Sequence, residues 1–102
     1  MQIRVRYVWD RAKASANLHK HGVSFDTALY VFSDPHITTK HDADNSIDED
    51  RWISIGLNAS FNPVLVVYTY NDQDLETHVV RIISARTPTR REAEAYWKER
   101  LQ

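Results

Sequence analysis

The stretch Val64-Leu65-Val66-Val67-Tyr68-Thr69-Tyr70 is the most apolar run of the chain, and it predicts the central strand of a sheet. Turn-forming residues bound it, because residues 58–63 precede it and residues 71–74 follow it. Beyond those turns, residues 51–56 and 78–84 predict two further strands. Consecutive strands joined by short turns pair antiparallel, so the middle of the chain predicts an antiparallel sheet.

The N-terminal part predicts one strand and two helices. Residues 3–7 alternate apolar and basic side chains, which is typical of a strand with one wet face. Asp10 is placed to cap a helix over about 11–21. The apolar spacing of residues 25–32 predicts a second helix.

The C-terminal part predicts a third helix. Thr89-Arg90-Arg91-Glu92 has the form of a capping box, which opens a helix that runs through about Leu101. The element order is then β-α-α, three or four strands, and α, which predicts an α+β fold. At 102 residues, we expect a single domain over residues 1–102.

Charge is divided unevenly along the chain. Residues 41–50 hold five acidic residues and no Lys or Arg, so with a net charge of −1 the remainder carries +4. A mildly basic body with one acidic loop attracts nucleic acid weakly, or the loop is simply solvated and binds nothing. Both interpretations stay open from charge alone.

Several classes of protein are excluded by composition. The chain has no cysteine, which excludes disulfides, thiolate metal sites and a cysteine nucleophile. The N-terminus lacks the apolar segment of a signal peptide, and no run reaches membrane-spanning length. We therefore expect a cytoplasmic protein without membrane association.

The acidic segment invites a test for metal binding. Its carboxylates fall on alternate positions, as in a calcium loop, but Ile47 and Ile53 stand where that loop needs glycine and glutamate. His36 and His41 leave one alternative, a metal hydrolase in which they join the loop carboxylates at a divalent site. The main prediction is a protein with no metal and no cofactor.

Two basic clusters, one within residues 9–25 and one within residues 81–92, hold most of the groups that can bind a phosphate or transfer a proton. In the first, His21 is a candidate base with Lys20 and Lys13 as charge stabilisers, or these cations simply favour the end of a helix. In the second, Arg81 lines a groove on the open face of the sheet, or it pairs with Asp10 or a loop carboxylate.

Arg86 follows the same strand, close to the start of the last helix. Together with Arg90, Arg91 and the amides of the helix start, it suits an anion such as phosphate. The alternative is a capped helix with solvated arginines.

The chain resembles the BrnT family of bacterial toxins, which belong to type II toxin–antitoxin pairs. The matching residues are Trp9-Asp10, Lys13, Asn17, Lys20-His21-Gly22-Val23-Ser24-Phe25, Asp34-Pro35, Arg51, Ile55-Gly56, Thr69, Arg81-Ile82-Ile83-Ser84-Ala85-Arg86, Arg91-Glu92 and Tyr96. The resemblance implies a RelE-like α+β fold: a small antiparallel sheet with two N-terminal helices packed on one face and a C-terminal helix. It also implies metal-independent cleavage of RNA by an endoribonuclease of the mRNA interferase type, which inhibits translation.

The implied partner is a BrnA-like antitoxin, a small ribbon-helix-helix protein. The two would form a complex that neutralises the toxin and represses their operon, so this chain would reach operator DNA only through the antitoxin. The alternative is a catalytically inactive co-repressor that binds the antitoxin and does not cleave RNA.

Cleavage of RNA without a metal uses the 2′-hydroxyl as nucleophile. It needs a base for that proton, an acid for the leaving 5′-oxygen, and cations around the phosphorane. We expect Arg86 and Arg51 to be the main stabilisers, with Arg81 lining the groove. The base is His21, assisted by Lys20, or alternatively Glu49. Further contacts to RNA are expected from a set of peripheral cations: Lys13, Arg90 and Arg91.

Overall fold

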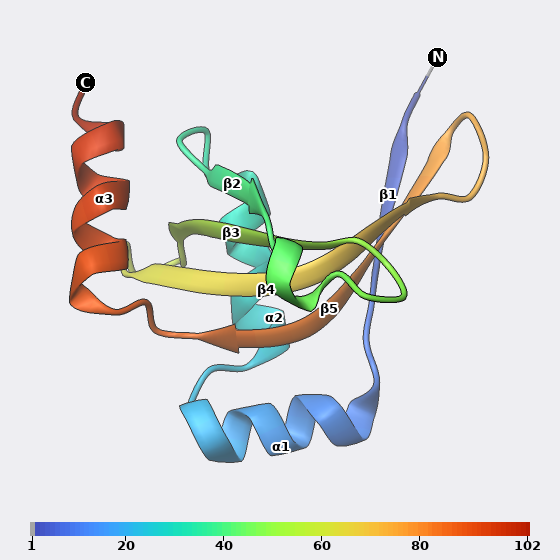
Figure 1. Ribbon diagram of the computed structural model, residues 1–102, viewed down its shortest axis with the longest axis horizontal. Coiled ribbons are helices and arrows are strands. Elements are labelled where there is room, and N and C mark those ends of the chain that lie inside the picture. Colours follow the sequence, from blue (N-terminus) through green and yellow to red (C-terminus); the bar gives the residue numbers. More distant parts are fainter. Residues whose placement is uncertain (1) are drawn as a thin grey trace.

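The chain folds around a five-stranded sheet with the order β1-β5-β4-β3-β2 (Figure 1). The computed structural model describes residues 2–102. Its elements in chain order are β1 (Arg4–Val8), α1 (Arg11–His21), α2 (Phe25–Ala28), η1 (Leu29–Ser33), β2 (Thr38–His41), η2 (Ala43–Asn45), β3 (Arg51–Leu57), β4 (Pro63–Asp72), β5 (Thr77–Arg86) and α3 (Arg90–Arg100). The α+β class is confirmed, and β4, the apolar run, is the central strand.

The sheet is mixed, so the expectation of a purely antiparallel sheet was wrong. The pairs β2–β3, β3–β4 and β4–β5 are antiparallel as predicted. β1, however, runs parallel to β5, with Arg4 opposite Thr77 and Val8 opposite Arg81. A long connection through helices and three strands separates β1 from β5, and such a connection does not impose the antiparallel pairing of a hairpin.

The predicted second helix has the right extent but two helix types. It is α-helical only over α2 and then tightens into the 3₁₀-helix η1. Tyr30, Val31 and Phe32 are aromatic or β-branched, and such side chains lose rotamer freedom in an α-helix. The spacing of apolar residues predicts which side chains face the core, but it does not distinguish an α-helix from a 3₁₀-helix.

The hydrophobic core lies on one face of the sheet. Phe25, Ala28 and Val31 from α2 and η1 are buried against strand residues that include Val66 and Ile82. Figure 1 shows α2 behind the sheet and η2 in front of it. We call the face that packs on α2 the covered face and the opposite one the open face.

Asn17 fixes α1 along the edge of β5. β1 pairs with β5 only as far as Arg81, so the rest of that edge has no strand beside it. The buried Asn17 amide replaces the missing strand: its Nδ2 donates to the carbonyl of Ala85 at 2.8 Å, and its Oδ1 accepts from the Ala85 amide at 3.1 Å. Nδ2 also donates to the carbonyl of Val23 at 3.0 Å, just after the helix ends. The side chain therefore satisfies backbone groups that burial would otherwise leave unpaired.

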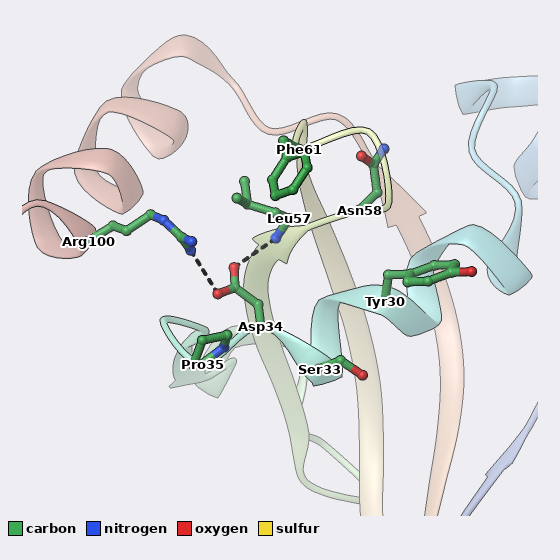
Figure 2. Close-up of a pocket in the computed structure, with 8 residues that line it drawn as sticks. All are labelled: Tyr30, Ser33, Asp34, Pro35, Leu57, Asn58, Phe61 and Arg100. Carbon is green, nitrogen blue, oxygen red and sulfur yellow. Dashed lines mark hydrogen bonds and ion pairs between the residues drawn. The ribbon is translucent and has the colours of Figure 1, made fainter.

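Asp34 joins η1, β3 and α3. Its buried carboxylate accepts from the Leu57 amide at 2.9 Å and from Arg100 at 2.8 Å (Figure 2), and also from the His36 amide and the Tyr96 hydroxyl. Burial alone would raise the pKa of Asp34, but the hydrogen bonds from Tyr96, His36, Leu57 and Arg100 outweigh it and lower the pKa to about 2.

Gly56 lets η1 approach the sheet closely. A Cβ at this position would lie 2.8 Å from the carbonyl oxygen of Val31 and 3.2 Å from the Cβ of Asp34. Because the nearer atom belongs to the backbone, no change of rotamer relieves the contact. Glycine is thus required where β3 passes under η1.

Asp34→Asn should lower the free energy of unfolding by about 3 kcal/mol at pH 7, because it leaves Arg100 without its buried partner. The folded pKa of Asp34 is about 2, below its unfolded value, so its contribution is present above about pH 4 and is lost as the pH falls to about 2. Urea unfolding followed by circular dichroism should therefore show a weaker acid dependence in the variant. Asp44→Asn, in an exposed loop, is the control; equal acid dependence in wild type and Asp34→Asn would contradict this account.

Gly56→Ala should lower the free energy of unfolding by about 1–3 kcal/mol, because the added methyl group overlaps the Val31 carbonyl. Combining it with Val31→Ala should not restore the melting temperature, since the clash is with the backbone. An unchanged melting temperature in Gly56→Ala would show that η1 does not approach β3 this closely.

Candidate functional site

The strand register lines up two arginines across the open face. Arg51 on β3 is the direct partner of Thr69 on β4, and Thr69 is the direct partner of Arg81 on β5. Direct partners in a sheet project from the same face. We call Arg51, Thr69 and Arg81 the first row; Thr69 is buried at its centre.

A bulge in β5 brings Arg86 to the same face as Arg81. Ser84 pairs with Val67 and Ile82 with Tyr68, so Ile83 is an extra residue without a direct partner. In a regular strand, residues five positions apart point to opposite faces. The bulge reverses the alternation, so Arg86 projects from the same face as Arg81.

The open face is basic. No strand residue that the structure describes on this face is acidic, whereas six are cationic: Arg4, Arg6, Lys40, Arg51, Arg81 and Arg86. The acidic segment 41–50 runs in front of the sheet, so it faces this surface (Figure 1). The uneven charge seen in the sequence is therefore also a division in space.

Glu49 brings a carboxylate to the first row. It contacts the guanidinium of Arg81 directly, and both side chains stay in contact with solvent. This is the loop-carboxylate pairing that the sequence left open, and it occurs on the open face. Arg51 lines a hollow of about 210 Å³ with Asp48 and Glu49, and its guanidinium makes no hydrogen bond or ion pair within residues 2–102. One carboxylate and two guanidinium groups thus meet at an exposed surface.

Arg86 is held by Glu92. Two hydrogen bonds, at 2.8 and 3.1 Å, join the guanidinium to both carboxylate oxygens. These bonds lower the pKa of Glu92 to about 2, and they raise the pKa of Arg86. The pair fixes the position of Arg86 at the point where β5 leads into α3.

The start of α3 is capped by its own side chains. The Thr89 amide donates to Glu92 at 2.7 Å, and the Glu92 amide donates to the Thr89 hydroxyl at 3.2 Å, which confirms the predicted capping box. Arg90 pairs with Glu94 in solvent, and Arg91 is exposed. The structure therefore favours a capped helix over the hypothesis of an anion site formed by free amides.

The cations of α1 belong to a helix beside β5 rather than to the sheet. Lys13, Lys20 and His21 are all exposed on α1, which lies alongside β5 (Figure 1). Asn17, in the middle of α1, contacts Ala85, four residues beyond Arg81, and His21 lies about one turn further along the helix. The structure does not bring the candidate base His21 to the first row.

The histidines considered as metal ligands also lie apart. His41 Nε2 contacts Asp50 at 3.0 Å, whereas the backbone amide of His36 donates to Asp34. In the part of the chain that the structure describes, no three His, Asp or Glu residues gather in a way that would hold a metal ion. The alternative of a metal hydrolase therefore has no ligand set there. No helix within residues 2–102 is both long and apolar enough to cross a membrane.

Sequence reasoning missed Lys40, which faces the open side next to Ile53. Its only sequence signal is its place in the short polar stretch that forms β2. It also gave no role to Thr69, although a threonine within the most apolar run was a usable signal.

Comparison with known proteins gives a family and a fold. The sequence model of a family described as "Ribonuclease toxin, BrnT, of type II toxin-antitoxin system" matches residues 9–92. The structure is similar to the crystal structure of the Brucella abortus ribonuclease toxin BrnT, with a TM-score of 0.60 and 20% sequence identity, over 85% of this chain and 100% of that chain. No curated protein matches the sequence. Because the family match covers well over half of the chain, including β2 to β5 and the first row, the chain belongs to the BrnT family of ribonuclease toxins of type II toxin–antitoxin systems.

Proposed function

We propose that this protein is a metal-independent endoribonuclease toxin that cleaves RNA at the first row of the open face. The observation that carries this proposal is the meeting of Glu49, Arg51 and Arg81 on a basic and solvent-accessible sheet face. A carboxylate can accept a proton, and two guanidinium groups can stabilise the charge of a phosphorane. RNA is the substrate because only RNA carries a 2′-hydroxyl that can act as an internal nucleophile.

In this mechanism Glu49 accepts the proton of the 2′-hydroxyl while the 2′-oxygen bonds to the adjacent phosphorus. The bond from phosphorus to the 5′-oxygen breaks, and that oxygen takes a proton from water, which reaches this exposed face. The hydroxide left behind takes the proton that Glu49 holds, which restores the carboxylate. Arg51 and Arg81 bind the phosphate oxygens throughout. The incoming phosphate competes with Glu49 for Arg81, which frees the carboxylate to act as a base.

Glu49 is preferred to His21 as the base because of position. A base has to lie within hydrogen-bond reach of the proton that it takes. Glu49 contacts an arginine of the first row, whereas His21 lies at the end of α1, beyond the contact of Asn17 with Ala85. Lys20 is also on α1, so it shares this disadvantage.

Arg86 is assigned to a flanking phosphate. It lies two rows from Arg81 along β5, which corresponds to about 13 Å at the usual rise of a strand. Arg51 and Arg86 therefore do not contact one phosphate together, as the sequence analysis expected. Arg51 and Arg81 replace that pair as the main stabilisers.

The family implies an antitoxin partner. The proposal includes a BrnA-like ribbon-helix-helix antitoxin that covers the basic open face, and through which the complex binds operator DNA. Cleavage of cellular mRNA in the cytoplasm would then inhibit translation whenever the antitoxin is lost. The unpaired Arg51 and Lys40 on the open face support a partner or substrate with negative charge.

Arg51→Ala, Arg81→Ala and Glu49→Gln should each lower the rate of RNA cleavage about 100-fold or more, because each removes a charge stabiliser or the base. The assay is cleavage of a 5′-labelled RNA in excess EDTA, with detection of 2′,3′-cyclic phosphate ends. Arg11→Ala, an exposed arginine at the start of α1, is the matched control. His21→Ala compares the two base candidates, and a larger loss in His21→Ala than in Glu49→Gln would reverse their assignment.

Full activity in all three variants would contradict the proposal that the active site lies at the first row. If the wild type cleaves no RNA, expression in cells without the antitoxin decides the function. Growth arrest would then point to cleavage that needs the ribosome, and normal growth would point to the inactive co-repressor.

A further inference from the structure

A groove lies between α3 and the open face of the sheet. It has a volume of about 390 Å³. The apolar side chains of Ile53, Ile55 and Leu65 line it from the sheet, and the two isoleucines remain half-buried rather than covered. The α3 side contributes Arg91, Glu92, Ala95, Tyr96 and Glu99.

The groove continues the first row along the strands. Ile53 is the partner of Lys40 and of Val67, and Val67 pairs with Ser84; these four residues form the second row. The third row consists of Thr38, Ile55, Leu65 and Arg86. Successive rows are about 7 Å apart, because each is two residues further along the strand. The apolar lining thus begins one row from the proposed cleavage position.

The rim of the groove carries unpaired positive charge. Lys40 on β2 and Arg91 on α3 line it, and neither side chain forms an ion pair within residues 2–102. Glu92 is neutralised by Arg86, and Glu99 adds one negative charge. The groove therefore combines an apolar floor with a rim that is positive on balance.

We propose that this groove binds the nucleotide next to the scissile phosphate of a single-stranded RNA. This inference rests on the proposed function, and it assigns a substrate site to residues outside the first row. The base lies on Ile53 and Ile55 through its apolar face, and the phosphate contacts Lys40 and Arg91. Recognition of RNA single strands commonly joins a contact to the face of the base with cationic contacts to the backbone.

The dimensions and charge of the groove favour a nucleotide over a protein segment. A compact space of about 390 Å³ is about 7 Å on a side, whereas a helix with its side chains is about 10–12 Å across. A purely apolar segment would leave Lys40 and Arg91 desolvated without a partner, which is costly. A nucleotide fills both the floor and the rim, and its strand continues directly into the first row.

The test measures binding separately from cleavage. Short dye-labelled RNAs that carry 2′-O-methyl groups throughout lack the nucleophile, so fluorescence anisotropy in EDTA reports affinity alone. The Lys40→Ala/Arg91→Ala variant should raise the Kd about tenfold, and it should reduce the slope of log affinity against log salt by about 1.4, as expected for two lost phosphate contacts. Arg11→Ala should bind like the wild type.

The base contact is tested with Ile53→Thr, which keeps the β-branched shape. This variant should bind normal RNA several-fold more weakly than the wild type. A panel of RNAs with one abasic site at each position should include one RNA that the wild type and Ile53→Thr bind equally, because the contact is already absent. The melting temperature of each variant verifies that it is folded.

Wild-type affinity and salt dependence in both variants would overturn the inference, even if the first-row variants abolish cleavage. If the same variants bind RNA normally but lose the antitoxin, the groove is a protein-docking site and the inference is also overturned. Conversely, groove-dependent binding by a protein that cleaves no RNA would support the inference while the proposed function fails.

Discussion

The buried carboxylate of Asp34 is the interaction on which the rest of this structure depends. It accepts hydrogen bonds from η1, β3 and α3 together, so it fixes three elements that are distant in sequence. A carboxylate with little exposure is stable only when such donors surround it, and these donors hold its pKa at about 2. Through Tyr96 and Arg100 it also positions α3 against the open face, and this placement creates the groove beside the arginines.

The open face depends equally on one irregularity of the sheet. The bulge at Ile83 turns Arg86 to the face of Arg81, and beyond the end of β1 the Asn17 amide pairs with the other edge of the same strand. A regular β5 would point one of the two arginines at the covered face, where burial without a partner would be unfavourable. The bulge is therefore part of the site, in keeping with the frequent occurrence of bulges where a strand has to redirect a side chain.

The parts of the fold that follow from local chemistry were predictable. The apolar run of β4, the caps at Asp10, Ser24 and Thr89, and the end of α1 at Gly22 depend on neighbouring residues, and all are present. The parallel pairing of β1, the bulge and the ion pair of Arg81 with Glu49 depend on contacts between residues far apart in the chain. The sequence spacing contains no signal for the parallel pairing or the bulge. It named Arg51, Arg81 and Glu49 as candidates and left a pairing of Arg81 with a loop carboxylate open, but it could not bring the three together or separate His21 from them.

The structure also divides the residues that carry the family resemblance into two kinds. Asn17, Asp34, Gly56 and Tyr96 are buried or tightly approached, and their contacts hold elements together, so any protein of this fold would need similar groups. Arg51, Arg81 and Arg91 make no such contacts with the core. Folding alone does not require several solvent-facing cations on one basic face, because like charges repel each other. The argument for chemistry on RNA therefore rests on these exposed residues, and the buried ones support the fold alone.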